Sequence, residues 1–328
     1  MMENNLKPIV SIICPTYNQE KFIASALDGF LMQKTTFPFE IIVHDDASTD
    51  GTPAIVKGYE SKYPETFRNI YQTENQLSKA NNNVIKITLA ASRGKYIAFC
   101  EGDDYWNDPL KLQRQVDFLE TNPDFSISCH RVFHLLPGMA PEIHQGSESE
   151  ETYTIDDLAK GNFIATVSVV FKNGLLSDLP FWLKDAPLGD YVLHMFNARH
   201  GKIKYFPQPM AVYRHGSGVW SGQQKDVGYK KLVNVIDFLL LEFSDKKVRE
   251  NLILQKLNYF MWIEDWSPDF NPSFSREEII IFVDARRNEK EKMESILNNP
   301  AILASKVSLK TLVNSVFKKL RIKKTHKK

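Results

Sequence analysis

Apolar and polar residues follow one another along the first 120 residues in blocks that predict strands and helices in turn. Two continuous apolar, β-branched runs, at residues 9–14 and 41–43, are typical of buried parallel strands. Between them apolar side chains recur at helical spacing, at Phe22, Ile23, Ala26, Leu27, Phe30 and Leu31. Strand, helix and strand within about 35 residues make a crossover unit. The pattern repeats downstream, which predicts an α/β fold with a mostly parallel sheet flanked by helices.

The same pattern indicates the later elements and the domain boundaries. We expect a helix from Thr52, as the N-cap before Pro53, to about residue 62, and further helices at 83–92, 108–119 and 190–199. We expect strands at 67–71, 95–100, 125–133 (half-buried), 163–171, 202–206 and 210–214, and a polar loop at 137–152. This predicts a domain over residues 1–220, with halves at about 8–120 and 121–220, and a helical C-terminal extension over 221–328.

Composition limits the classes of protein to consider. With 328 residues, 43% of them apolar, and a net charge of +1, the chain can form a substantial core and is no general nucleic-acid binder. Cys14, Cys100 and Cys129 form no CxxC pair, which fits a reducing cytosol rather than a disulfide framework or a zinc ribbon. The N-terminus lacks the features of a signal peptide, and no apolar run reaches about 18 residues. We expect a cytoplasmic protein that is neither exported nor membrane-spanning.

The motif CEGDDYW, at residues 100–106, places three carboxylates directly after a buried strand. Like charges this close repel one another unless a cation or a proton relieves them. Two further polar motifs, PTYN at 15–18 and DDASTDGT at 45–52, also follow predicted strands. Since ligands of open α/β sheets bind beyond the carboxyl ends of the strands, we expect one crevice to hold all three motifs. Carboxylate oxygens there would suit a hard divalent cation, Mn²⁺ or Mg²⁺.

A calcium loop is a second interpretation of DDASTDGT, because Asp46 can start an EF-hand spacing with Gly51 at position six. Position twelve, which requires a bidentate Glu, is Lys57, and a strand instead of a helix precedes the loop. The EF-hand is therefore excluded. A polar turn with helix-capping residues remains as the alternative to a binding loop.

Three motifs follow one another along the chain: PTYN, then DDASTDGT, then EGDD, which is followed by an aromatic residue and a helix that begins with proline. This order resembles glycosyltransferase family 2, over about residues 8–220. The resemblance implies the Rossmann-like GT-A fold and a nucleotide-sugar donor, usually uridine-linked. It implies that Asp104 binds a divalent cation on the diphosphate of the donor, and that Asp103 faces the ribose or a metal-bound water. Successive residues of an extended chain point to opposite faces, so the two aspartates should not be equivalent ligands.

The resemblance also implies where the rest of the donor lies. Pro15, Tyr17 and Asp46 would hold the base, with Tyr17 stacked on its ring and Asp46 accepting its N–H hydrogen bond. Tyr17 could equally serve packing. Lys79 or Arg93 could help the metal to neutralise the departing diphosphate, or could be surface charges.

Transfer with inversion needs a general base for the proton of the acceptor hydroxyl. The family places an acidic residue at the start of a helix for this role, and Asp190 in LGDY matches it, with Gly189 where relatives often carry Glu. The alternative role of Asp190 is that of a helix N-cap. The segment AVYRHGSGVW, at 211–220, resembles the family's later glycine-rich loop, which would close over the diphosphate. It suggests His215 as a further metal ligand, although relatives commonly have a residue between the Arg and the His.

The C-terminal segment from Ser295 has no acidic residue and ends in a run of lysines. Apolar residues within it fall on one helical face, at Leu309, Leu312, Val313, Val316, Phe317 and Leu320. Such a basic amphipathic helix could lie on an anionic membrane, at the inner face of the plasma membrane. Equally, it could dock on the protein and end in a frayed tail.

The sequence thus predicts an inverting, metal-dependent glycosyltransferase that acts on a saccharide or lipid-linked saccharide in cell-surface polysaccharide synthesis, an acceptor class taken from the family alone. A sugar nucleotidyltransferase would need a glycine-rich basic loop after the first strand, which PTYNQEKF lacks. A non-catalytic carbohydrate-binding or scaffolding protein is the other alternative, and loss of Asp104 or Asp190 would have favoured it. Nucleic acid is not an expected partner, because no aromatic residues interleave with the basic tail.

Overall fold

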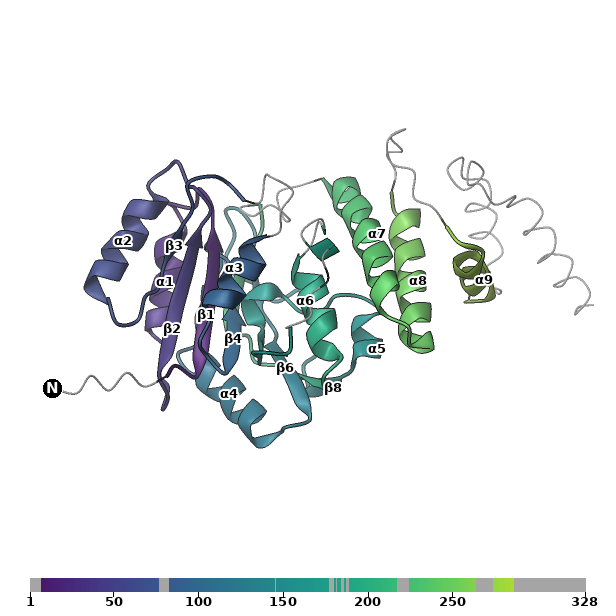
Figure 1. The fold of residues 1–328 in the computed structure, drawn as a ribbon, viewed down its shortest axis with the longest axis horizontal. Helices are drawn as coiled ribbons and strands as arrows, with labels where there is room; N and C mark the ends of the chain where they lie inside the picture. The colour runs from purple at the N-terminus through teal and green to yellow at the C-terminus, as the bar shows by residue number, and fades with distance from the viewer. Residues whose placement is uncertain are drawn as a thin grey trace, which may run out of the picture. The chain divides into compact units, whose positions relative to one another are not determined.

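Two β-sheets with surrounding helices make up the first 223 residues of the chain, as a computed structural model shows (Figure 1). The structure describes residues 7–76, 83–144, 146–176, 180, 182–183, 186, 189–216, 224–263 and 274–285. The strands are β1 (Val10–Thr16), β2 (Phe39–Asp45), β3 (Ile70–Tyr71), β4 (Tyr96–Phe99), β5 (Tyr105–Trp106), β6 (Phe125–His130), β7 (Phe133–Leu135), β8 (Glu151–Tyr153), β9 (Val170–Lys172), β10 (Lys202–Phe206) and β11 (Ala211–Arg214). The helices of this part are α1 (Ile23–Leu31), α2 (Thr52–Lys62), α3 (Asn83–Ala91), α4 (Lys111–Thr121), α5 (Ile155–Leu158), the 3₁₀ turn η1 (Thr166–Ser168) and α6 (Gly189–Ala198).

The larger sheet is mostly parallel, as the sequence predicts. Its strand order is β3-β2-β1-β4-β9-β6-β10-β8, and the smaller sheet has the order β5-β11-β7. β1 pairs in parallel with β2 and β4, whereas β9 is antiparallel to both β4 and β6. The carboxyl ends of β1, β2 and β4 therefore lie at one edge of the sheet, and the three polar motifs follow them there.

Helices cover both faces of the larger sheet. Val10, Ile12 and Cys14 of β1 are fully buried in a core shared with α1, α2 and α4. On the other face lies α3, on the opposite side of the sheet from α2 (Figure 1). Gly29 brings α1 close to the acidic motif, because a Cβ added there would lie 2.8 Å from the carbonyl oxygen of Trp106. A larger residue would separate α1 from β5.

The start of α2 differs from the prediction that Thr52 is its N-cap. Gly51 is the N-cap and Thr52 the first helical residue. Oδ1 of Asp50 accepts the hydrogen bond of the Thr52 N–H over 2.9 Å, so the capping carboxylate is that of Asp50. The hydroxyl oxygen of Thr52 instead accepts from the Gln19 N–H at 2.8 Å, which fastens the loop after β1 to α2.

Two strand predictions in the second half are wrong. Residues 163–171 form the turn η1 and only then the short strand β9, because a buried apolar run does not distinguish a strand from a buried turn. The predicted half-buried strand at 125–133 is β6, which is buried on both faces and ends at His130, and β7 starts a second sheet at Phe133.

The described residues from 224 onward belong to a second compact unit. Its described helices are α7 (Lys225–Glu242), α8 (Lys246–Met261) and α9 (Arg276–Ala285). Lys256 of α8, 1% exposed, lies between Asp237 of α7 at 2.5 Å and Glu278 of α9 at 2.6 Å. No helix in the described part of the chain is long and apolar enough to cross a membrane. The predicted amphipathic tail at 295–328 lies outside the described residues.

Candidate active site

The loops after β1 and β2 are bound to each other by side chains of their own motifs. Asn18 donates its N–H to Ser48 Oγ at 2.9 Å and accepts the Thr49 N–H at 2.7 Å. Glu20 accepts the N–H of Gly51 at 2.7 Å. PTYN and DDASTDGT thus form one rigid rim at the carboxyl edge of the sheet.

Both loops contain a residue in the left-handed region of backbone space. Among the described residues other than glycine, positive φ occurs at Asn18 (53°) and Ala47 (64°). For alanine this conformation costs about 1–2 kcal/mol. Strained residues of this kind cluster at binding and catalytic sites, so the strain supports a functional role for the rim.

The aspartate pair of CEGDDYW is buried below this rim, with Asp103 4% and Asp104 1% exposed. Oδ1 of Asp104 accepts the backbone N–H of Arg214 at 2.7 Å, whereas Oδ2 is buried without a hydrogen-bond partner. Burial, and after it the charges of Asp103 and Glu101, raise the pKa of Asp104 well above its usual value. A carboxylate in this situation is stabilised by a cation.

Glu101 belongs to the same acidic group, although no role was predicted for it. Its side chain is in part exposed to solvent. The protein around the carboxylate disfavours the charged form by desolvation, and this effect and then the charges of Asp103 and Asp190 raise the pKa of Glu101 to about 8. Glu101, Asp103 and Asp190 therefore lie within electrostatic reach of one another. Residues 101–104 form a turn, in which the Asp104 N–H bonds to the Glu101 oxygen at 3.1 Å, so the alternation expected of an extended chain does not apply to these carboxylates.

The acidic motif fits a divalent cation that shares its coordination with a ligand. Asp104 offers a buried carboxylate oxygen with no other partner, and Asp103 and Glu101 add negative charge. Within the described ranges, no three His, Cys, Asp or Glu side chains lie together as a complete metal cage. Mg²⁺ and similar ions commonly take one or two carboxylates and complete their shell with phosphate and water. The predicted ligand Asp104 could bind a metal in this way.

The three residues predicted to hold a base lie at the carboxyl ends of β1 and β2, Pro15 within β1 and the other two just after the strands. The carbonyl oxygen of Pro15 accepts the N–H of Gly102 at 3.0 Å, which joins PTYN to the acidic motif. Tyr17 is 44% exposed, so its ring is open to a ligand. Asp46 is buried, and its Oδ1 accepts the Gln76 N–H at 2.7 Å. This contact holds the segment after β3 against the site, and the role of Asp46 toward a base stays a prediction.

Asp190 lies in the first turn of α6, where the sequence predicts it. The partial positive charge of the helix N-terminus favours a carboxylate at this position. Thr166 of η1 donates its hydroxyl to Oδ2 of Asp190 at 3.2 Å. The carboxylate is half-buried, and its charge is one of the causes that raise the pKa of Glu101.

Two of the other predicted residues, His215 and Arg93, have partners in the structure. Nε2 of His215 lies 2.9 Å from Nδ1 of His134, so the structure pairs His215 with another imidazole, and its metal role stays a prediction. Arg93 bonds to Glu40 before β4, at the amino end of the strands, so it does not reach a diphosphate at the carboxyl edge. Lys79, Leu188 and the glycine-rich residues beyond 216 lie outside the described residues.

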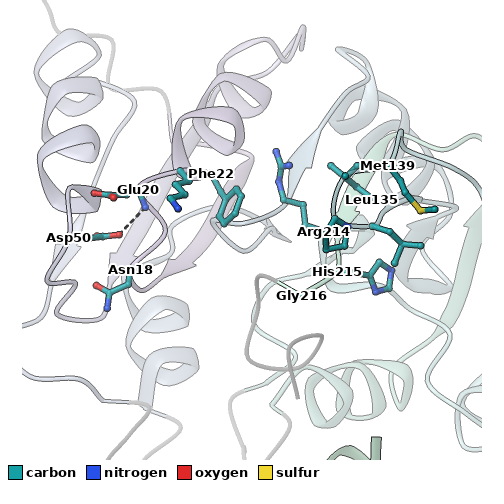
Figure 2. Close-up of a pocket in the computed structure, with 13 residues that line it drawn as sticks. Asn18, Glu20, Phe22, Asp50, Leu135, Met139, Arg214, His215 and Gly216 are labelled. Carbon is teal, nitrogen blue, oxygen red and sulfur yellow. Dashed lines mark hydrogen bonds between the residues drawn. The ribbon is translucent and has the colours of Figure 1, made fainter. Parts of the chain in front are cut away.

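Arg214, whose backbone N–H bonds to Asp104, lines a pocket of about 790 Å³ (Figure 2). One wall comes from the rim, with Asn18, Glu20 and Asp50, and the other from Leu135, Met139 and the segment 214–216. The guanidinium of Arg214 lies over the rings of Phe22, at 5.1 Å, and Tyr105, at 4.8 Å. The pocket therefore has one polar wall, from the rim, and one wall that is largely apolar.

The sheet order, the flanking helices and the acidic carboxyl edge together define a GT-A glycosyltransferase fold. Residues 11–166 match the model of Glycosyl transferase family 2. The match supports assigning this segment to glycosyltransferase family 2.

Relatives and solved structures agree with this classification. An uncharacterised protein of Mycobacterium tuberculosis is 41% identical over 220 residues, which is 66% of this chain and 62% of that protein. A putative teichuronic acid biosynthesis glycosyltransferase of Bacillus subtilis, TuaG, is 32% identical over 51% of this chain and 63% of its own length. The chain thus spans less than two thirds of the length of these relatives.

The solved structures show the fold. TarS of Staphylococcus aureus in complex with UDP-GlcNAc has a TM-score of 0.59 and 20% identity, over 85% of this chain and 80% of that one. A mannosyltransferase of Pyrobaculum calidifontis in complex with GDP-Man and Mn²⁺ has a TM-score of 0.55 and 17% identity, over 96% and 87%.

Proposed function

We propose that the chain is an inverting, metal-dependent glycosyltransferase that moves a sugar from a uridine-linked nucleotide sugar to a hydroxyl of a saccharide. One observation carries this proposal. Thr166 donates its hydroxyl to Asp190 Oδ2 at 3.2 Å, and the next residue, Val167, accepts the indole N–H of Trp106 at 3.0 Å. Because Trp106 stands two residues after Asp104, these contacts support one crevice for the candidate base and the acidic motif at the carboxyl edge of the sheet. Loops of two other strands complete this crevice.

In this mechanism each acidic residue has a separate task. Asp104, with Asp103 beside it, would hold a divalent cation, and this cation would neutralise the charge that develops on the departing diphosphate. Asp190 accepts the proton of the acceptor hydroxyl as that oxygen attacks the anomeric carbon from the side opposite the diphosphate. Attack from that side inverts the configuration of the sugar. Tyr17 and Asp46 hold the base of the donor.

The comparisons support the donor class and the acceptor class in part. One structural neighbour was solved with UDP-GlcNAc and another with GDP-Man and Mn²⁺. TuaG carries a name from teichuronic acid biosynthesis, which supports a cell-surface polysaccharide or a lipid-linked saccharide as acceptor. Such an acceptor would bring the protein from the cytoplasm to the inner face of the plasma membrane.

Turnover of a panel of UDP-, GDP- and dTDP-sugars, with and without Mn²⁺, tests the proposal. We expect Mn²⁺-dependent release of the nucleoside diphosphate from one donor, and its loss in Asp104→Ala and Asp190→Ala. Asp104→Ala should also lose the response to the metal, whereas Asp190→Ala should still bind the donor with Mn²⁺. If no nucleotide sugar bound under any condition, the proposal would be wrong.

A further inference from the structure

Four consecutive residues at η1 each contact a different element around the candidate site. Each contact is a hydrogen bond. Thr166 donates its hydroxyl to Asp190 Oδ2 of α6 at 3.2 Å, and the Val167 oxygen accepts the indole N–H of Trp106 of β5 at 3.0 Å. The Ser168 oxygen accepts from Gln115 Nε2 of α4 at 2.9 Å, and the Val169 oxygen accepts from the Phe99 N–H of β4 at 3.4 Å. The turn thereby links the candidate base to the strand and the helix on either side of the acidic motif.

We propose that η1 is a positioning element that sets Asp190 in register with the acidic motif, and that Thr166 is the positioning residue for this base. The inference rests on the proposed function, since it concerns the same reaction. The hydroxyl of Thr166 fixes one carboxylate oxygen of Asp190, which leaves the other oxygen for the proton of the acceptor. A general base acts only when it lies within hydrogen-bond reach of that proton.

The turn is rigid enough for this task. Val167 and Ser168 are fully buried, and Ser168 closes the turn by donating both its N–H, at 2.8 Å, and its hydroxyl, at 2.7 Å, to the Ala165 oxygen. Buried backbone carbonyls that accept side-chain N–H groups hold their positions, because leaving such a donor unpaired costs about 1–3 kcal/mol.

Trp106 connects the turn to the acidic motif. It stands two residues after Asp104, is 1% exposed, and packs edge-on against Phe30 with ring centroids 4.8 Å apart. Its ring also lies 4.1 Å from the ammonium of Lys111. Because these contacts fix the indole, its N–H sets the distance between the acidic motif and η1. Trp106→Phe keeps an aromatic ring at this position and removes this hydrogen bond together with part of the indole packing.

The test compares Thr166→Val, which keeps the branched shape and loses the hydroxyl, with Thr166→Ser, which keeps the hydroxyl. With the donor and Mn²⁺ identified, Thr166→Val should lower kcat by about tenfold or more while the KM for the donor stays the same, and Thr166→Ser should restore most of the rate. Trp106→Phe should behave like Thr166→Val. The matched control is Thr88→Val, because the hydroxyl of Thr88 is buried and bonds only within α3, to the oxygens of Val84 and Ile85. A wild-type kcat in Thr166→Val would overturn the proposal.

A second measurement does not depend on turnover. Thermal unfolding of Thr166→Val, Asp190→Ala and the double variant forms a cycle, and the contact predicts that the shift in Tm caused by Thr166→Val shrinks in the Asp190→Ala background. Additive shifts would show that the two side chains do not interact and would overturn the positioning role. The wild type could turn over no nucleotide sugar while the cycle was non-additive. The contact between Thr166 and Asp190 would then exist, but the proposed function would be wrong and the contact would have no role in catalysis.

Discussion

The backbone N–H of Arg214 donates a hydrogen bond of 2.7 Å to Oδ1 of Asp104, which joins two residues 110 positions apart. Asparagine at position 104 would keep this acceptor oxygen and remove the charge. The position therefore allows the structural and the metal-binding roles of the side chain to be separated.

We expect Asp104→Asn to keep or raise the Tm in the presence of a chelator, because burial and the neighbouring carboxylates disfavour a charge here. Mn²⁺ with UDP should raise the Tm of the wild type and leave that of the variant unchanged. Asp117→Asn, on the exposed side of α4, is the control and should respond as the wild type does. A metal-induced shift in Asp104→Asn would exclude Asp104 as the metal ligand.

Two helical glycines provide a matched test of the packing beneath the acidic motif. A Cβ at Gly29 would lie 2.8 Å from the Trp106 oxygen and 2.9 Å from its nitrogen, whereas a Cβ at Gly58 of α2 would meet nothing within 4 Å. We expect Gly29→Ala to destabilise the protein by about 1–3 kcal/mol, and Gly58→Ala to stabilise it by about 0.5–1 kcal/mol. Urea unfolding measures both, and a neutral Gly29→Ala would show that α1 can move away from β5 freely.

The buried ammonium of Lys111 predicts a dependence of stability on pH. Its hydrogen-bond partner is Gln115 Oε1 at 2.8 Å, and burial lowers the pKa of Lys111 from 10.5 to about 7. Between these values the unfolded chain binds a proton that the folded protein does not. The wild type should therefore gain about 1.4 kcal/mol of unfolding free energy per pH unit relative to Lys111→Met as the pH rises from 7 toward 10.

Urea unfolding of both proteins across this pH range measures the difference. Lys34→Met, at an exposed position on the same domain, serves as the control and should give a difference that does not vary with pH. A constant difference for Lys111→Met as well would mean that the lysine keeps its ordinary proton affinity inside the protein.

The second unit depends on one buried cation. Lys256 neutralises Glu278, whose side chain is 9% exposed, and Asp237, whose side chain is 43% exposed. Lys256→Met should destabilise the helices by about 3 kcal/mol, near the lower end for a broken buried pair because solvent screens Asp237. Combining it with Asp237→Asn and Glu278→Gln removes the uncompensated charges and should recover part of the loss. Far-UV circular dichroism during heating measures the stability of the single and the triple variant. If the triple variant recovered no stability, packing alone would hold the helices together.

The first half of the fold and the place of the acidic residues could be predicted from the sequence. Parallel strands bring their carboxyl ends to one edge, so motifs that follow residues 14, 43 and 100 had to meet. Helix and strand boundaries there follow apolar runs and agree within about three residues: β3 begins at Ile70 and α4 at Lys111, each three residues later than expected. The N-cap of α4 is Leu110, and at the start of α2 Asp50 caps and Thr52 binds another loop.

The contacts that join the halves could not be predicted. η1 lies in an apolar stretch of the sequence. Its turn depends on hydrogen bonds that its backbone carbonyls accept from Trp106 and Gln115, which are far away in sequence. β5 is only two residues long, too short for a periodic pattern. By contrast, α5 carried a signal that was missed, because Thr154 and Asp157 form a capping box at its start.

The position of β9 between β4 and β6 has a consequence for how the chain folds during synthesis. β4 leaves the ribosome long before β9, which pairs with it as Tyr96 with Lys172 and Ala98 with Val170. Until then β4 is an open edge, the kind of surface on which strands of other chains aggregate. Residues 8–120 and 121–220 therefore cannot be exchanged between relatives as independent pieces, because a chimera joined near residue 120 has to reproduce this pairing across the junction.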